Sequence, residues 1–180
     1  NHERAVIIGQ RTFGKGSVQL LFDNPDQSAL KLTIAQYLTP GDISIQSVGV
    51  TPSVELSPIL LTEEETYVFG SPEESYGEAT LPEHLVSDKS EQSKLQKPLM
   101  SLRYMQDPEL LKQARDEPNK IFVDFEIEFA RDLLKGAKGQ ASLKRLLKSA
   151  EALMSAEQAE QEAALDEQLK ARGVRWRSEV

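Results

Sequence analysis

The hydrophobic pattern of this chain changes its period at Asp107-Pro108, and that change most constrains what the chain can fold into. Up to residue 58, apolar residues come in short runs or in alternation, which is typical of strands. After residue 108 they recur at spacings of three and four, which is typical of amphipathic helices. The sequence therefore predicts an α/β (α+β) protein with its strands first and its helices last.

The first 58 residues are predicted to be rich in strands. The apolar run Ala5–Gly9 is typical of a buried strand. Ser17–Phe22 and the alternating stretch Ala29–Leu38 predict a hairpin, because the turn-forming residues Asp23–Asp26 lie between them. A second turn signal follows the hairpin, and the short stretches from Ser44 to Pro52 are predicted to form a returning edge.

Residues 59–107 show no sustained hydrophobic period and carry most of the acidity of the chain. They hold 10 acidic and 4 basic residues, which contribute −6 to the formal net charge of −8. The run Glu63–Glu65 lacks the ligand spacing of a calcium site and is expected to be solvated. We therefore expect an acidic, mostly irregular linker between domains 1–58 and 108–180. No stretch has a basic face, so nucleic acid is not an expected partner.

Residues 108–180 are predicted to form three or four helices. Pro108 suits the first turn of a helix with Asp107 as its N-cap. Ser155–Gln158 resembles a capping box, which predicts a separate last helix that ends near Gly173. That helix has few large apolar residues, so we expect it on the surface or against a partner. Between these two helices, apolar stripes at helical spacing predict two more, interrupted by glycines: Phe122, Phe125, Phe129, Leu133 and Leu134, then Gly136 and Gly139, then Leu143, Leu146, Leu147, Ala150, Leu153 and Met154.

The stretch Gly14–Gln19 isolates one lysine between two glycines, shortly after the first predicted strand. Gly9–Lys15 matches the first seven positions of the phosphate-binding P-loop, G-x-x-x-x-G-K-[ST]. Gly16 then stands where a hydroxyl group should meet magnesium, and a strand follows where the P-loop needs a helix. The sequence therefore disfavours nucleotide binding.

A second interpretation makes Lys15 a general base. A lysine amine accepts a proton only when it is neutral, so the ordinary lysine pKa of about 10.4 must fall by several units, through burial away from carboxylates. No acid lies between Arg4 and Phe22. In an extended segment Lys15, Ser17 and Gln19 share one face, so the Gln19 amide can hold the amine without adding charge. A solvated lysine in a plain surface loop explains these residues alone equally well.

Residues 4–52 closely resemble the C-terminal processing peptidases, or tail-specific proteases, a family of serine peptidases with a Ser/Lys dyad. The family motif T-F-G-K-G-x-x-Q is present without a gap as Thr12–Gln19, and the family's Ser-Ile-Gln follows as Ser44–Gln46. The resemblance implies that Lys15 is the general base and that Gln19 orients it. It also implies a partial peptidase core in residues 1–58, with no metal or organic cofactor.

By the same resemblance, the nucleophile lies outside this chain. The family's serine sits on a helix roughly two dozen residues before the lysine, which is about ten residues before Asn1. We therefore expect a fragment of an endopeptidase that cleaves protein substrates near their accessible C-termini, inactive by itself. Its compartment is expected to be extracytoplasmic, most often the bacterial periplasm. Where the family usually has Ser-Gly-Arg, this chain has Gly41–Ile43, which changes the charge at any substrate contact there.

Other residues suggest alternatives that carry less weight. Ser17 is discounted as a nucleophile, because a lysine rarely takes a hydroxyl proton from a residue two positions away. His2 and His84 are too far apart in the sequence to indicate a metal site or a Ser/His/Asp triad. No apolar run reaches the roughly 20 residues that span a bilayer. The rival function is a non-catalytic interaction module on a degenerate peptidase scaffold, with residues 108–180 as the expected homo-oligomer contact.

Overall fold

The computed structural model describes residues 5–61, 66–67, 77–82, 84–90, 96–137 and 142–174. The chain forms two compact units, one made of Arg11–Thr51 with Glu74–Lys97, the other of His2–Gln10, Pro52–Glu73 and Pro98–Val180. Strands and helices both build the molecule, so the predicted α/β class is confirmed. In the part of the chain that the structure describes, no helix is long and apolar enough to cross a membrane.

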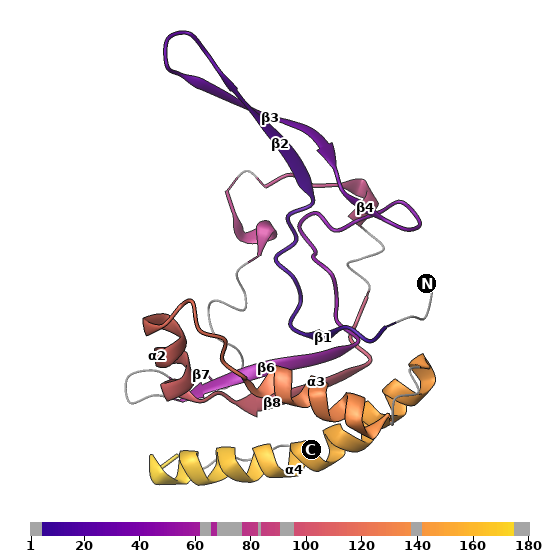
Figure 1. The fold of residues 1–180 in the computed structure, drawn as a ribbon, viewed down its shortest axis with the longest axis vertical. Helices are drawn as coiled ribbons and strands as arrows, with labels where there is room; N and C mark the ends of the chain where they lie inside the picture. Colours follow the sequence, from indigo (N-terminus) through magenta and orange to yellow (C-terminus); the bar gives the residue numbers. More distant parts are fainter. Residues whose placement is uncertain are drawn as a thin grey trace. The chain divides into compact units, whose positions relative to one another are not determined.

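The second unit is built on a small sheet with β6 (Val54–Leu61) as its central strand. β1 (Ile8–Gly9) and β8 (Met100–Met105) pair with β6 in parallel, on either side of it (Figure 1). β7 (Thr66–Tyr67) pairs with the end of β6 in the antiparallel sense. Most of β6 is buried, as expected of a parallel strand whose faces are covered.

Two helices cover this sheet and form the main core with it. α3 (Phe125–Gly136) begins at the N-cap Asp124, whose carboxylate accepts a hydrogen bond from the Ile127 amide at 2.9 Å. The ring of Phe125 stacks on Tyr104 of β8 with 4.4 Å between centroids. The core combines apolar side chains of β6, β8, α3 and α4: Val54, Leu56, Leu102, Tyr104, Phe129, Leu133, Ala137, Leu146, Ala150 and Met154.

The predicted break at Ser155 is wrong, because α4 runs without interruption from Leu143 to Ala171. The Ser155 hydroxyl donates to the Glu151 carbonyl one turn earlier, at 3.0 Å, instead of capping a new helix. The end near Gly173 is confirmed, since Gly173 takes a positive φ of 73° just after the helix. Leu165 and Leu169 are buried against Ile59 and Leu61 of β6, so the last turns are part of the core.

The sequence predicts a mostly irregular linker over residues 59–107, and this is wrong at both ends of that range, where the residues belong to strands. Ile59–Leu61 complete β6, and Met100–Met105 form the buried neighbour β8. Between them lie η1 (Glu78–Thr80) and η2 (Asp88–Ser90), two short 3₁₀ helices of the first unit. The acidic run Glu63–Glu65 lies outside the described residues. The Asp107 cap of α2 (Pro108–Asp116) is confirmed, since Asp107 accepts from the Glu109 amide at 2.9 Å.

The first unit contains the predicted hairpin. β2 (Ser17–Asp23) pairs with β3 (Ala29–Gln36) in the antiparallel sense, and the register shifts between Val18 and Gln19. β4 (Leu38–Thr39) and β5 (Ile43–Ser44) make a second, very short ladder. The returning edge predicted from Ser44 to Pro52 is wrong beyond Ser44, where β5 ends. The residues that follow Ser44 form turns that pack against the lysine loop.

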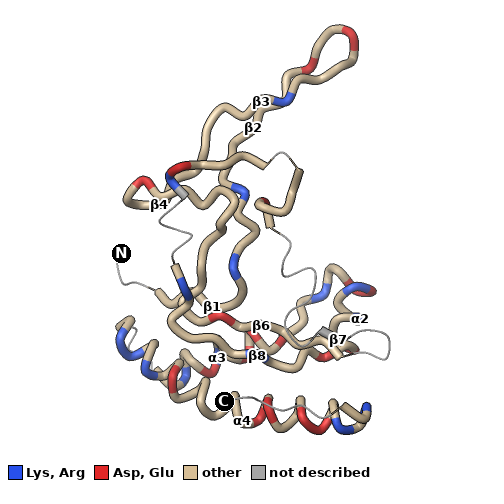
Figure 2. Tube along the Cα trace, turned by 180° about the vertical axis from the view of Figure 1, so that it is seen from behind, with Lys and Arg blue, Asp and Glu red and all other residues tan. Residues whose placement is uncertain are grey.

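Acidic residues recur along the second half of α4 (Figure 2). Two of them, Glu157 and Glu160, line a hollow together with Glu128 and Asp132 of α3. Partial burial, together with the charges of Glu160, Asp132 and Glu128, raises the pKa of Glu157. A carboxyl group whose pKa is raised by folding lowers stability at pH values above that pKa, and the loss disappears as the pH falls below its unfolded value.

The variant Glu157→Gln is therefore expected to be more stable than the natural chain at pH 7, by about 0.3 kcal/mol given solvent screening. The two proteins should converge below about pH 4, where the carboxyl is protonated. Urea unfolding at both pH values measures the difference, with Glu151→Gln, at an exposed position of the same helix, as the control. A gain that persists at low pH would contradict the electrostatic explanation.

Candidate functional site

The candidate site is the loop around Lys15, which joins β1 to β2. Gly14 has a positive φ of 90°, and a Cβ atom there would lie 2.8 Å from the Gly49 amide nitrogen. A Cβ atom on Gly16 would lie 3.1 Å from the Gln46 nitrogen. The Gly14 carbonyl accepts from the Ser47 amide at 2.8 Å. A side chain at position 14 would therefore clash with residues 45–49, which pack directly on the loop, and a Cβ atom at position 16 would fit only tightly.

A second layer holds the start of this loop. Gly49 has a φ of 68°, and a Cβ atom there would lie only 2.0 Å from the Thr12 carbonyl oxygen. The Thr12 amide donates to the Val50 carbonyl at 3.2 Å, and the Val50 amide donates to the Thr12 hydroxyl at 2.8 Å. Thr12, the first residue of the motif, is therefore tied by backbone contacts to the segment that follows β5.

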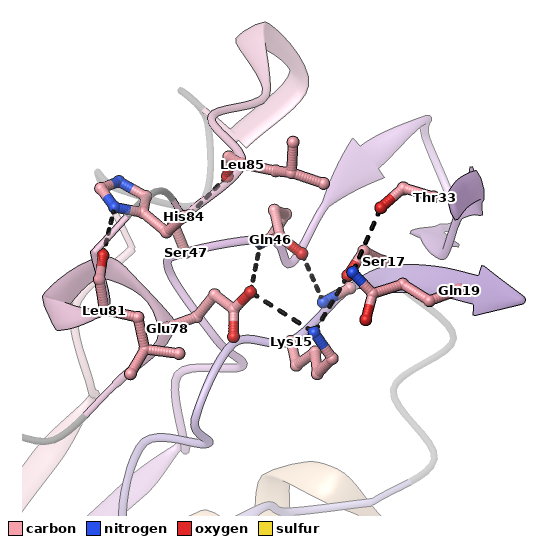
Figure 3. A network of polar contacts seen from close by, with 11 residues as sticks. Lys15, Ser17, Gln19, Thr33, Gln46, Ser47, Glu78, Leu81, His84 and Leu85 are labelled. Carbon is pink, nitrogen blue, oxygen red and sulfur yellow. Dashed lines mark hydrogen bonds and ion pairs between the residues drawn. The ribbon is translucent and has the colours of Figure 1, made fainter. Parts of the chain in front are cut away.

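The Lys15 amine lies between a hydroxyl and a carboxylate (Figure 3). Its Nζ donates to Ser17 Oγ at 3.3 Å and forms an ion pair with Glu78 Oε1 at 3.6 Å. The Lys15 side chain is 49% exposed, whereas that of Glu78 is only 7% exposed. Glu78 begins η1, and its amide donates to the Phe13 carbonyl at 2.9 Å.

Gln46 connects the carboxylate to the backbone of the loop. Its side chain is fully buried, and its Oε1 accepts from the Gly16 amide at 2.8 Å. Its Nε2 donates to Glu78 Oε1 at 3.1 Å. The Gln46 side-chain amide therefore holds the loop through its oxygen and the Glu78 carboxylate through its nitrogen. The sequence did not reveal this role, even though Gln46 belongs to the Ser-Ile-Gln stretch of the family.

The acid-free surroundings that the sequence predicts for Lys15 are wrong. The sequence argument considered only residues near Lys15 along the chain, whereas Glu78 comes from the acidic middle stretch. Nothing in the pattern around Glu78 distinguishes it from the other acids of that stretch. The structure therefore adds a buried carboxylate to the site.

Among the described residues, the side chain of Gln19 makes its polar contact with β3 and not with Lys15. The Gln19 amide nitrogen donates to the Thr33 hydroxyl of β3 at 3.2 Å. The register shift between Val18 and Gln19 interrupts the strict alternation on which the shared-face prediction depended. The orienting role of Gln19 therefore stays a prediction.

The remaining candidates are placed as follows. Ser17 is within hydrogen-bond distance of Lys15, closer than the sequence argument allowed for. The Nδ1 atom of His84 faces the Leu81 carbonyl at 3.2 Å, and His2 lies outside the described residues. The described part of the chain contains no group of three His, Cys, Asp or Glu side chains arranged to hold a metal ion.

A hollow of about 310 Å³ adjoins the Lys15 contacts in the first unit. Its walls combine apolar and polar side chains of β2, β3 and the two segments that follow: Ser17, Thr33, Ala35, Gln36, Gln46, Leu85 and Val86. Leu85 is fixed there by its carbonyl, which accepts from the Ser47 hydroxyl at 2.9 Å. The site thus combines an amine, a buried acid and a mainly apolar recess.

Comparison with known proteins locates the similarity in this part of the chain. Residues 1–56 match the model of peptidase family S41. A chloroplastic C-terminal processing peptidase of Tetradesmus obliquus is 44% identical over 59 residues, which are 33% of this chain and 13% of that protein. A carboxy-terminal-processing protease of Bartonella bacilliformis is 50% identical over 54 residues, 30% of this chain and 12% of the relative.

These matches confirm the resemblance that the Thr12–Gln19 motif indicated, and they confine it to the first third of the chain. The aligned stretches make up about one eighth of the length of these relatives. No solved structure matches the chain. Glu78, Leu85 and the helices lie beyond the matched residues.

Proposed function

We propose that the protein to which this chain belongs is a serine endopeptidase that cleaves protein substrates near their C-termini with a Ser/Lys dyad. The observation that carries the proposal is the unbroken motif Thr12–Gln19, which lies within the family match and is folded so that a side chain at position 14 would clash with the segment packed on the loop. The relatives named above are themselves C-terminal processing proteases.

In the proposed reaction, neutral Lys15 removes the hydroxyl proton of a serine upstream of this chain as that oxygen attacks the scissile carbonyl. Lys15 then gives the proton to the leaving amine, and water hydrolyses the acyl-enzyme by the same route in reverse. Gln19 is proposed to orient the amine. The reaction needs no metal or organic cofactor, and the present chain is proposed to be inactive without the serine.

The proposed setting follows the bacterial members of the family: an extracytoplasmic compartment, most often the periplasm, with protein substrates that present free C-termini. A homo-oligomer contact through residues 108–180 stays a proposal. The rival idea of a free interaction module loses its main support, because the last turns of α4 are buried against β6.

An assay of peptide cleavage by the full-length protein tests the proposal. Peptides with a free C-terminus are expected to be cut at least about tenfold faster than the same peptides amidated at the C-terminus, since the proposed recognition needs the terminal carboxylate. Mass spectrometry of the products locates the cut. Equal rates for both peptides would contradict recognition of the C-terminus.

The variant Ser17→Ala separates the two serines that could act as nucleophile. Ser17 stands at a variable position of the motif, so its replacement is expected to leave cleavage within about threefold of the natural rate, whereas alanine in place of the upstream serine should abolish it. If Ser17→Ala abolishes cleavage in a folded protein, the upstream nucleophile is the wrong assignment.

A further inference from the structure

Glu78 is a buried carboxylate that the proposed reaction does not use. The residue is 5% exposed, its Oε1 contacts Gln46 and Lys15, and its Oε2 is buried without a hydrogen-bond partner among the described residues. A carboxylate is costly to bury unless it is paired, so its position against Lys15 requires an explanation. Glu78 also lies beyond the residues that match the family.

Both the backbone and the side chain of Glu78 are held by hydrogen bonds, so its carboxylate has a fixed position beside the loop. The Glu78 amide is bound to the Phe13 carbonyl, one position before the Gly14–Gly16 turn. Gln46 bridges Oε1 to the Gly16 amide. The contacts form a closed ring of Lys15, Gly16, Gln46 and Glu78, which Figure 3 shows from close by. The ring places Oε1 at the amine whenever residues 77–82 are folded on the loop.

Three other titratable groups that the structure describes in this unit have partners away from the Lys15 amine. The Arg11 guanidinium donates to the carbonyls of Val48 and Gln96. The His84 ring faces the Leu81 carbonyl. The Asp26 carboxylate accepts hydrogen bonds from the amide and the hydroxyl of Ser28 in the hairpin turn. Among the described residues, Glu78 is therefore the charged group that is paired with Lys15.

We propose that Glu78 is a further positioning residue of the dyad, which holds the Lys15 ammonium through the ion pair between Nζ and Oε1 and so restrains it from acting as the base. This inference rests on the proposed function. An ammonium has no lone pair and cannot accept the serine proton, so the ion pair restrains the reaction at neutral pH. Loss of the carboxylate charge releases the amine.

The decisive variant is Glu78→Gln in the full-length protein, because glutamine keeps the shape and the oxygen that accepts from Gln46 but removes the charge. We expect kcat/KM at pH 7 to rise about tenfold and the acid limb of the pH–rate profile to move to lower pH, with the partial exposure of Lys15 limiting the gain. Asp88→Asn makes the same charge change at an exposed position of η2, and should leave the profile unchanged.

A chemical measurement on the 180-residue chain is independent of peptidase activity. Brief acetylation with acetic anhydride, read by mass spectrometry, reports how readily each amine reacts in its neutral form. Glu78→Gln should raise the rate at Lys15 at pH 7 to 8 and leave that at Lys31, exposed on β3, unchanged. If Glu78→Gln fails to fold, Glu78→Asp, which withdraws the carboxylate by one methylene, should change both measurements in the same direction by less.

The outcomes separate the two proposals. Unchanged acetylation and an unchanged pH–rate profile in folded Glu78→Gln would overturn the inference and leave the proposed function standing. A fall in kcat/KM with no movement of the acid limb would also overturn it, since that result indicates a merely structural role. Faster acetylation of Lys15 in a protein that has no peptidase activity would support the ion-pair role while the proposed function fails.

Discussion

Lys15→Ala is expected to reduce peptide cleavage by the full-length protein at least about a thousandfold, with little change in folding. The size follows from the proposed role, because removing the base of a nucleophile–base pair typically removes nearly all the benefit of the pair. The side chain is half exposed and makes one hydrogen bond and one ion pair at its tip, so its loss leaves no cavity in a core. The measurement is kcat/KM on a peptide with a free C-terminus.

Two controls make this result specific to the amine. Lys31→Ala removes an exposed lysine from β3 of the same unit and should keep the natural rate. Lys15→Arg keeps the positive charge beside Glu78 but puts a group there that stays protonated, so it should be as inactive as the alanine variant. Cleavage that survives in either Lys15 variant would show that Lys15 is not the base.

The sequence predicted local structure well where one short stretch contains the whole signal. The β2–β3 hairpin follows from alternation on both sides of the Asp23–Asp26 turn, and the start of α2 follows from Asp107 and Pro108. These features depend on neighbours in the chain. The two glycines beside Lys15 are a local signal of the same kind, since glycine permits close approach of backbone and both Gly14 and Gly16 lie against residues 45–49.

The missed strands depend on contacts between distant residues. β6 was not predicted, and it contains Pro58, a residue that argues against a central strand. The proline is tolerated because, on the side of β6 away from β8, β1 pairs only as far as Glu55 and β7 pairs only from Leu60 onward. β8 carries Arg103 within a short apolar run and is stabilised by pairing with β6. The false start at Ser155 shows that a capping pattern inside a run of good helix formers does not end a helix.

In the candidate site too, the residues of the local motif could be predicted from the sequence, whereas those from distant segments could not. The motif identified Lys15, whereas the acid that faces it arrives from η1, in a stretch whose many acids look alike in the sequence. The face on which Gln19 lies was argued from ideal alternation, which the register shift after Val18 interrupts. The family resemblance could therefore be recognised from the motif, but the electrostatic surroundings of its lysine could not.

Gly49→Ala is expected to have the largest effect on the stability of the lysine loop, about 3 kcal/mol or more. The positive φ of 68° alone costs an alanine roughly 1–2 kcal/mol. In addition the new Cβ would lie 2.0 Å from the Thr12 carbonyl oxygen, which belongs to the backbone and cannot turn aside as a flexible side chain would. Thr12 must therefore move, and its hydrogen bonds with Val50 must break or stretch.

Gly173→Ala is the matched control, because Gly173 has a similar φ of 73° and no atom within 4 Å of an added Cβ. It should show the backbone cost alone, roughly 1–2 kcal/mol. Hydrogen exchange of the Thr12 and Val50 amides measures the loop in the first unit, and urea unfolding measures each variant as a whole. In the full-length protein Gly49→Ala should also lose cleavage, because a displaced Thr12 carries the whole Gly14–Gly16 turn with it. Equal losses of stability for the two variants would show that the close approach to Thr12 does not hold the loop.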